Sequence, residues 1–409
     1  TMRLMSRIKN SLLYRSRVYA RRGKVAILGV YRTFSNNRSG INLVGYFSYT
    51  FGVAEVGRFF AQHAKKGGVP FRIYDMETPS HKKLDEISLE FYRPYFTYRP
   101  PYQKNVFFVN ADQIANLKDQ LPELFAGRYN AAVFFWEFND YFNFPQAFKV
   151  INEVFAFTDF IATAVRKVAP RTVKVTKLPF PFIQNWQITK PAGVIREQYN
   201  IPSDAFVFIF NFDFFSVYER KNPEAILRAF KLAFSAGENV YLVLKTIHGE
   251  AVSETNTSFQ VLVNHMVSKD KIVVVNDNLD RNDFMNLINA SDCYISLHRS
   301  EGLGLGMLEA MSMGKPVIAT NFGGNTDFMR QDNSLLVDYS LVAVKENAKP
   351  YQPGWLWAEA DVQQAADYML RLVEDRAFAN ELGKRARESV QKQYGNDVFE
   401  KTLNDWIKS

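Results

Sequence analysis

The segment from Asp292 to Phe328 constrains the fold more than any other part of the chain. It begins with a short apolar run, 293–297, of the length and composition of a buried strand. A loop with three glycines follows, then helical apolar spacing over 307–311, and then a second short apolar run, 317–320. Another glycine pair, Gly323 and Gly324, comes just after that run. This order predicts part of an open, parallel α/β sheet.

Both glycine loops follow predicted strands, and open parallel sheets bind ligands at the carboxyl ends of their strands. Free backbone amides at a helix N-terminus attract an anion, and glycines let a phosphate come close to the backbone. Glu309, in the first turns of the predicted helix, is placed to accept hydrogen bonds from a hydroxyl pair. Glu301 reaches the same pocket from the loop. The residue types therefore indicate a phosphate joined to sugars as the ligand.

The run HRSEGLGLGMLEAMSMGKPVIAT, residues 298–320, resembles the retaining glycosyltransferases of family 4 almost without a break. The mark of that family is a pair of glutamates in this setting, which here are Glu301 and Glu309. The resemblance implies the GT-B fold, in which two Rossmann-like α/β domains with doubly wound parallel sheets face a cleft. It also implies that Glu301 contacts the donor sugar and Glu309 the ribose of a nucleotide-diphosphate sugar. The donor would further lie beside Gly302, Leu303, Gly304 and Leu305. The alternative is a glycine-rich turn in an ordinary Rossmann-like domain.

The composition is that of a soluble globular protein, with 47% apolar and 22% charged residues in a chain of 409. That length accommodates two domains, each with its own core. No apolar run approaches the length that spans a bilayer, and the single cysteine, Cys293, excludes an internal disulfide framework. We therefore expect the protein in the reducing cytoplasm, either free or peripheral on the inner face of the membrane.

The net charge of +8 is concentrated at the amino end, since residues 1–37 contain nine Lys and Arg and no acid. Apolar residues recur there at roughly helical spacing, which is typical of a segment that lies on an anionic membrane surface. The alternative is a solvated tail or a linker. No nucleic-acid-binding module accompanies the basic residues, so nucleic acid is not an expected partner. The start at Thr1 indicates a chain that was trimmed or cut from a longer polypeptide.

We expect four parts along the chain. The basic segment 1–37 precedes an acceptor-side Rossmann-like domain, 38–182, which ends in a stiff segment with prolines at alternate positions. A nucleotide-sugar-binding domain, 183–390, follows. The last part, 391–409, is expected to contain a helix that crosses back to the first domain.

In the first domain, a strand over 41–47 leads into a glycine loop and a helix. In the resembled family a glycine loop at this place faces the cleft and can approach the donor phosphates. Gly52, on the donor side, and Arg58, on the acceptor side, fit that description. The alternative for Arg58 is a helix-surface arginine. Trp136 and Glu137 end a buried run, where Trp136 offers a face for a sugar ring and Glu137 a carboxylate for the acceptor hydroxyl.

For these two residues the alternative is a core tryptophan and a structural carboxylate. Related enzymes often have a His or an acid at this place, and this chain has no His there. Glu153, in INEVFAF, is predicted as a second acceptor-side carboxylate.

In the second domain, Arg220 and Lys221 lie just ahead of a predicted helix, where cations suit a diphosphate and the charge that grows on it as the glycosyl bond breaks. Only Lys221 aligns cleanly with the family's Arg and Lys pair, so which of the two contacts which phosphate stays open. Lys245 ends a predicted strand as a third cation, with an interdomain salt bridge as the alternative. Asn276 follows the next strand, where the family's loop meets the nucleotide base.

Two classes of enzyme are not supported by the sequence. There is no DxD pair, and the five scattered histidines form no HxxxH motif. A metal-dependent enzyme is therefore not supported, and no metal or other cofactor is expected. Neither glycine loop has the GxGxxG spacing of a dehydrogenase.

The expected function is therefore retaining, metal-independent transfer of a hexose from a nucleotide-diphosphate sugar to a hydroxyl of a growing glycan or lipid-linked acceptor. The resemblance points to bacterial O-antigen, capsule or exopolysaccharide synthesis. It implies attack on the face from which the phosphate departs, with the leaving group taking the proton. Two alternatives remain, a non-catalytic GT-B unit of a larger synthase and a nucleotide-sugar epimerase of the same fold.

Overall fold

The computed structural model describes residues 39–49, 52–78, 83–140, 144–182, 186–266, 269–346, 348, 351–395 and 397–408. The basic segment 1–37 and its expected membrane contact lie outside these residues. No helix in the described ranges is long and apolar enough to cross a bilayer.

The first sheet has six parallel strands in the order β2-β1-β3-β4-β5-β6. The strands are β1 (Ile41–Gly45), β2 (Phe71–Asp75), β3 (Lys104–Phe108), β4 (Tyr129–Val133), β5 (Glu153–Ala156) and β6 (Lys174–Lys177). The helices between them are α2 (Gly52–Lys66), α3 (Glu86–Leu89), α4 (Ala111–Gln120), α5 (Pro145–Phe148) and α6 (Asp159–Arg166).

A ladder of buried asparagines fixes the register of three neighbouring strands in this sheet. The Asn42 side chain donates to Asn105 at 2.8 Å, and Asn105 donates to Asn130 at 2.8 Å. Buried amides need such partners, because an unsatisfied polar group in the core is costly. A shift of one residue would break this ladder and turn the apolar side chains to the wrong face.

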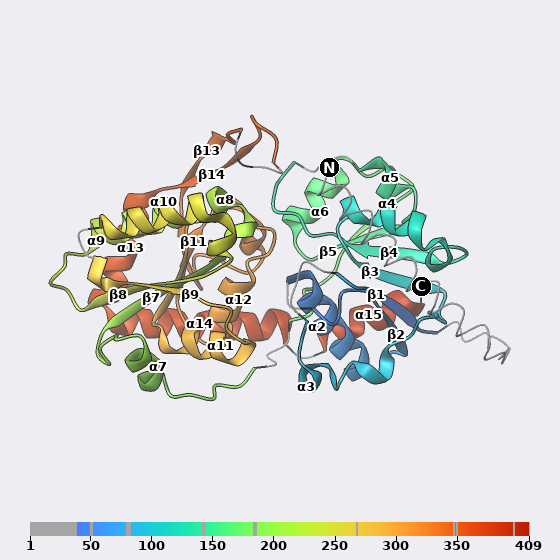
Figure 1. The fold of residues 1–409 in the computed structure, drawn as a ribbon, viewed down its shortest axis with the longest axis horizontal. Helices are drawn as coiled ribbons and strands as arrows, with labels where there is room; N and C mark the ends of the chain where they lie inside the picture. The colour runs from blue at the N-terminus through green and yellow to red at the C-terminus, as the bar shows by residue number, and fades with distance from the viewer. Residues whose placement is uncertain are drawn as a thin grey trace, which may run out of the picture. The chain divides into compact units, whose positions relative to one another are not determined.

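The second sheet is also parallel, in the order β12-β11-β10-β7-β8-β9. The strands are β7 (Phe206–Asp213), β8 (Val240–Ile247), β9 (Ile272–Asn276), β10 (Cys293–Ser296), β11 (Val317–Thr320) and β12 (Leu335–Val337). The helices are α7 (Ala192–Gln198), α8 (Tyr218–Lys221), α9 (Pro223–Ala233), α10 (Ser253–Asn264), α11 (Arg281–Ala290), α12 (Leu305–Ser312), α13 (Val362–Glu374) and α14 (Arg376–Tyr394). Figure 1 shows α9 and α13 on one side of this sheet and α11 and α14 on the other.

A hairpin and a C-terminal helix lie outside the two sheets and the helices between their strands. Strands β13 (Tyr339–Ala343) and β14 (Leu356–Ala360) form an antiparallel hairpin. Helix α15 (Val398–Lys408) packs on α2, and its Trp406 ring meets Phe155 of the first sheet edge-on at 5.0 Å. The two six-stranded parallel sheets confirm the predicted two-domain, Rossmann-like α/β fold, while the exact domain boundaries stay a prediction.

Candidate active site

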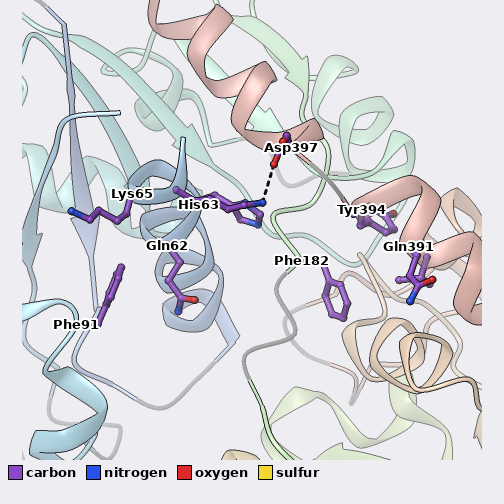
Figure 2. A pocket seen from close by; sticks show the side chains of 11 residues that line it. Gln62, His63, Lys65, Phe91, Phe182, Gln391, Tyr394 and Asp397 are labelled. Atoms are coloured by element: carbon purple, nitrogen blue, oxygen red, sulfur yellow. Dashed lines mark ion pairs between the residues drawn. The ribbon is translucent and has the colours of Figure 1, made fainter. Parts of the chain in front are cut away.

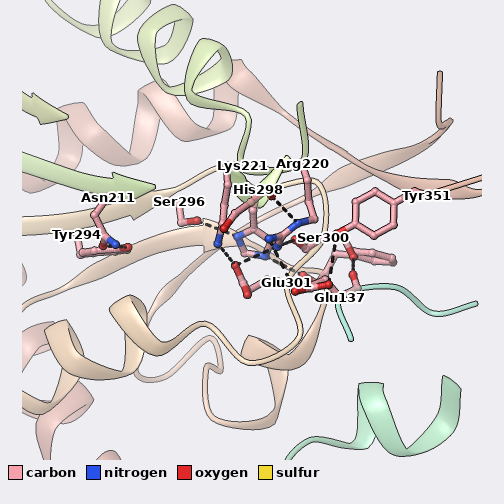
Figure 3. A network of polar contacts seen from close by, with 12 residues as sticks. Glu137, Asn211, Arg220, Lys221, Tyr294, Ser296, His298, Ser300, Glu301 and Tyr351 are labelled. Atoms are coloured by element: carbon pink, nitrogen blue, oxygen red, sulfur yellow. Dashed lines mark hydrogen bonds and ion pairs between the residues drawn. The ribbon is translucent and has the colours of Figure 1, made fainter. Parts of the chain in front are cut away.

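The centre of the candidate site is an ion pair between α8 and the glycine loop after β10. Lys221 Nζ lies 2.6 Å from Glu301 Oε2. Left-handed residues precede and follow α8, Val217 with φ 62° and Asn222 with φ 53°. The Asn222 amide donates to the Leu297 carbonyl at 3.0 Å, which fixes α8 to the end of β10. Helix α8 and the glycine loop after β10, which are far apart in the sequence, therefore meet at this ion pair (Figure 3).

Arg220 lies beside this pair and is buried, with 3% of its surface exposed. Its Nη1 donates to the Ser300 carbonyl at 3.0 Å and lies 3.5 Å from Glu301 Oε2. Burial would lower the pKa of the guanidinium, but Tyr351, Glu137 and Glu301 outweigh burial and raise it. Arg220 is therefore a permanent positive charge at the site.

The Glu301 carboxylate is ionised because two neighbouring cations stabilise its negative charge. Burial would raise its pKa, but Lys221 and Arg220 dominate and lower the pKa to about 2. The prediction that Glu301, Arg220 and Lys221 share one site is supported by these distances, and their chemical roles stay predictions.

Glu137 joins the site from the loop after β4. Its Oε1 lies 4.0 Å from Arg220 Nη2, and a third of its side chain is exposed. The Ser300 hydroxyl donates to the Glu137 carbonyl, and the Tyr351 hydroxyl donates to Glu137 Oε2 at 3.3 Å. Tyr351 belongs to the connection between β13 and β14 and was not predicted, because nothing in the sequence links it to residues so far away along the chain.

His298 lies directly under the loop and is fully buried. Its Nδ1 is 2.9 Å from the Ser296 hydroxyl, and its Nε2 is 2.9 Å from the Phe322 carbonyl. Burial lowers the pKa of the imidazole, so the ring is neutral and donates from Nε2 to that carbonyl. His298 therefore ties the two glycine loops together.

The glycine loops approach each other too closely for side chains. A Cβ on Gly324 would overlap the carbonyl of Gly302, and a Cβ on Gly302 would overlap the carbonyl of Trp136. Gly304 has φ 89° and stands immediately before α12, where Leu305 is the first helical residue. Leu303 is half-buried in the same loop. These loops form the predicted strand, glycine loop and helix unit.

Glu309 lies on α12 with 1% of its surface exposed. Its Oε1 is 2.5 Å from Nη2 of Arg281, the first residue of α11. The Arg281 guanidinium lies 4.9 Å from the ring centre of Trp186. Sequence reasoning missed both Arg281 and Trp186, since neither stands in a recognisable motif.

Lys245 and Asn276 lie on adjoining strands of the same sheet. Lys245 is 8% exposed, and burial lowers its pKa to about 8 although Asp277 and Asp213 oppose the shift. Within the described ranges Lys245 forms no salt bridge, so the interdomain alternative is not observed there. Asn276 accepts a hydrogen bond from the Thr246 hydroxyl at 3.0 Å at the end of β9.

Arg58 is neither a phosphate-facing cation nor a surface residue. It is 6% exposed, and its Nη1 donates to the carbonyls of Phe47 at 3.0 Å and Tyr49 at 2.7 Å. Its Nε donates to Glu55 Oε2 at 3.0 Å, and its Nη2 pairs with the same oxygen. Arg58 thus holds the loop after β1, and both predictions for it are wrong. Gly52 begins α2 with open space around it among the described residues, and its contact with the donor stays a prediction.

Trp136 is a core residue. It is 9% exposed, its indole nitrogen donates to the Asp140 carbonyl at 2.7 Å, and its ring packs edge-on against Tyr351 and Trp355. The prediction of a sugar-stacking face is wrong, because neighbouring aromatic rings cover the indole.

Glu153 is not an acceptor-side carboxylate. It begins β5, so it lies at the amino end of the sheet, opposite the end where Glu137 stands. It is fully buried and accepts hydrogen bonds from Trp406 at 2.8 Å, from Tyr129 at 2.8 Å and from Thr176. Its role is to anchor α15 on the first sheet.

A separate cavity of about 540 Å³ lies between α2 and the end of α14. Its lining includes Gln62, Lys65, Phe91, Phe182 and Tyr394, and none of the predicted site residues (Figure 2). In the described part of the chain, no three His, Cys, Asp or Glu side chains converge as they would around a metal ion.

The second half of the chain is similar to known proteins. Residues 193–389 match the family model described as glycosyl transferases group 1. The chain is 28% identical over 148 residues to a poly(ribitol-phosphate) alpha-N-acetylglucosaminyltransferase of Staphylococcus aureus, covering 33% of this chain and 26% of that protein. It is 26% identical over 136 residues to the N-acetyl-alpha-D-glucosaminyl L-malate synthase of Bacillus anthracis, covering 33% and 30%. The chain thus spans less than a third of the length of either relative.

The crystal structure of Anabaena HepE in complex with UDP and glucose is similar in fold. It superposes with a TM-score of 0.62 at 13% sequence identity, over 90% of this chain and 99% of that one. This likeness confirms the predicted GT-B arrangement of two Rossmann-like domains.

Proposed function

Because residues 193–389 match the family model of the group 1 glycosyl transferases, we propose that the protein is a retaining, metal-independent hexosyltransferase. It moves a hexose from a nucleotide-diphosphate sugar to a hydroxyl of a glycan or lipid-linked acceptor. The observation that carries this proposal is the convergence of Lys221 and Arg220 on Glu301. Two cations on one ionised carboxylate, ahead of the N-terminus of α9, fit a site for a diphosphate and a sugar.

The two cations stabilise the leaving group. As the bond between the anomeric carbon and the diphosphate oxygen breaks, negative charge grows on the diphosphate, and preorganised cations lower the barrier most where charge develops. Arg220 is buried and fixed by the Ser300 carbonyl, so it supplies charge without reorganisation. Lys221 is partly exposed and exchanges Glu301 for a phosphate oxygen when the donor binds.

Glu301 then holds hydroxyls of the donor sugar. An ionised carboxylate that is partly exposed, as Glu301 is, can accept two such hydrogen bonds, and Glu309 accepts those of the ribose. The acceptor oxygen attacks the anomeric carbon on the face from which the diphosphate leaves, and its proton passes to the departing phosphate oxygen. No base from the protein is needed for that transfer, which agrees with the low pKa of Glu301.

Glu137 serves the acceptor side. Its carboxylate is partly exposed and faces Arg220, so a hydroxyl bound to it would lie near the developing negative charge. Tyr351 orients the carboxylate through its hydroxyl.

The donor nucleotide is proposed to be UDP. The HepE structure contains UDP and glucose, and the two curated relatives are named for N-acetylglucosaminyl products. The acceptor is proposed to be a bacterial cell-surface glycan, reached in the cytoplasm, with residues 1–37 on the anionic membrane surface.

Calorimetric titration of the purified protein with UDP, GDP, ADP and dTDP, each with and without EDTA, tests the donor site. The account predicts binding of UDP that EDTA does not change, and a ligand that binds the folded state also raises the melting temperature. Binding that EDTA abolishes would contradict metal independence, and no binding of any of the four would contradict the donor site.

A further inference from the structure

Glu309 is a buried carboxylate that lies against a cation. Its Oε1 is 2.5 Å from Arg281 Nη2, and this oxygen is itself buried. The contact is an ion pair, and no other donor to Oε1 lies within the described residues. A carboxylate that is removed from water needs a partner of opposite charge to stay ionised. Arg281 is therefore the group that balances the charge of Glu309.

Arg281 itself is held in place from outside the pair. It is the first residue of α11, and its guanidinium lies over the ring of Trp186 at 4.9 Å. A cation over the face of an indole is attracted by the ring quadrupole, and the contact also restricts the side chain. The Arg281 side chain is 29% exposed and the Glu309 side chain is 2% exposed, so Arg281 lies on the solvent side of the ion pair.

The charges around Glu309 make Arg281 its counterion. Burial raises the pKa of the Glu309 carboxyl above its ordinary value, the charge and hydrogen bond of Arg281 oppose that rise in part, and Glu55 on α2 adds to it. Burial raises the pKa of the Tyr294 phenol on β10, and the charge of Glu309 raises it further. Of these groups only Arg281 is a cation.

We propose that Arg281 is a positioning residue for the donor, which holds the Glu309 carboxylate charged and in place to accept the ribose hydroxyls. This inference rests on the proposed function, since it takes Glu309 to be the ribose acceptor. A carboxylate accepts hydroxyl hydrogen bonds more strongly than a carboxylic acid does, because charge-assisted hydrogen bonds are the stronger ones. Nucleotide affinity without Arg281 is then limited by the protonation of Glu309.

The test is UDP binding by calorimetry between pH 5.5 and 9 for the wild type, Arg281→Gln, Arg281→Lys and Arg281→Gln/Glu309→Gln. Arg281→Gln should bind UDP about tenfold more weakly than the wild type at pH 6 and regain affinity as the pH rises. Arg281→Lys, which keeps the charge, should follow the wild-type pH profile. The double variant should be weak at every pH, with no recovery. Arg330→Gln is the matched control, because Arg330 pairs with Asp332 on the surface and both side chains are more than half exposed.

The outcomes separate this inference from the proposed function. If the wild type binds UDP but Arg281→Gln is weakened equally at all pH values, Arg281 only shapes the site and the inference is overturned. If Arg281→Gln does not fold, an Arg281→Lys profile that departs from the wild type overturns it as well. If the wild type binds none of the four nucleotides, the proposed function fails, and the role of Arg281 fails with it.

Discussion

Lys221 Nζ lies 2.6 Å from Glu301 Oε2, although the two residues are 80 positions apart in the chain. The contact joins the last residue of α8, after β7, to the glycine loop after β10. These two strands are neighbours in the second sheet, so their carboxyl ends bring the loops together.

Lys221→Ala should mainly lower turnover. Removing one preorganised group that stabilises transition-state charge typically costs about 100-fold to 1,000-fold in kcat. Steady-state kinetics with varied donor should show that loss with a much smaller change in KM. Lys231→Ala is the matched control, since Lys231 is an exposed residue of α9. Unchanged turnover in Lys221→Ala would remove this residue from the leaving-group role.

Glu137→Gln should weaken use of the acceptor and leave the donor site intact. The amide keeps the shape of the side chain but loses the charge that faces Arg220. We expect the acceptor KM to rise or kcat to fall by about tenfold or more, with UDP affinity within about twofold of the wild type. Asp140→Asn, an exposed change in the same loop, is the control. An equal loss of UDP affinity would place Glu137 on the donor side instead.

Gly324→Ala should damage the donor site, because the added methyl group would overlap the Gly302 carbonyl. Relief requires a backbone shift in one of the glycine loops, so UDP binding should fall steeply and the melting temperature should drop. Gly193→Ala, in α7, has open space around its Cβ among the described residues and should leave UDP binding unchanged. A Gly324→Ala protein that binds UDP with wild-type affinity would show that the two glycine loops are free to separate.

Glu153→Gln should reduce stability in a pH-dependent way. Burial would raise the pKa of Glu153, but hydrogen bonds from Thr176, Trp406 and Tyr129 lower it below its ordinary value. A carboxyl whose pKa is lowered by folding stabilises the fold above its unfolded pKa, and that stabilisation is lost as the pH falls through the folded pKa.

Urea unfolding should therefore show wild type above Glu153→Gln by about 1–3 kcal/mol at pH 7, and the difference should shrink below pH of about 4. Activity of the folded variant should stay near that of the wild type. A constant difference from pH 7 to pH 3 would contradict the ionised state of Glu153.

Structural features that are encoded in one continuous stretch of the sequence could be predicted. The unit from β10 to β11 was predicted because apolar runs, glycines and the Glu301 and Glu309 pair all fall within one local pattern. The prediction of Glu153 as an acceptor-side carboxylate was wrong, because Glu153 lies at the opposite end of the sheet. In a short apolar run, sequence alone does not distinguish the first residue of a strand from one just past its end. The register of β5 decides between them, and pairing with β4 and β6 sets that register.

Residues whose partners are distant in sequence could not be predicted. Arg58 was expected at the cleft, with a helix-surface residue as the alternative, but its position depends on how α2 packs against the loop after β1. Tyr351 reaches Glu137 from the β13 and β14 connection, and Arg281 reaches Glu309 from a different helix. Such contacts follow from tertiary packing, which a single sequence does not display.

The most direct test of the central claim is proton NMR of the transfer reaction in EDTA, with UDP-glucose as donor and a panel of methyl glycosides as acceptors. Wild type should form a product that keeps the α configuration of the donor, and Lys221→Ala should form it far more slowly. A β-configured product, or transfer that stops when EDTA is added, would contradict a retaining site in which Lys221 and Arg220 replace a metal.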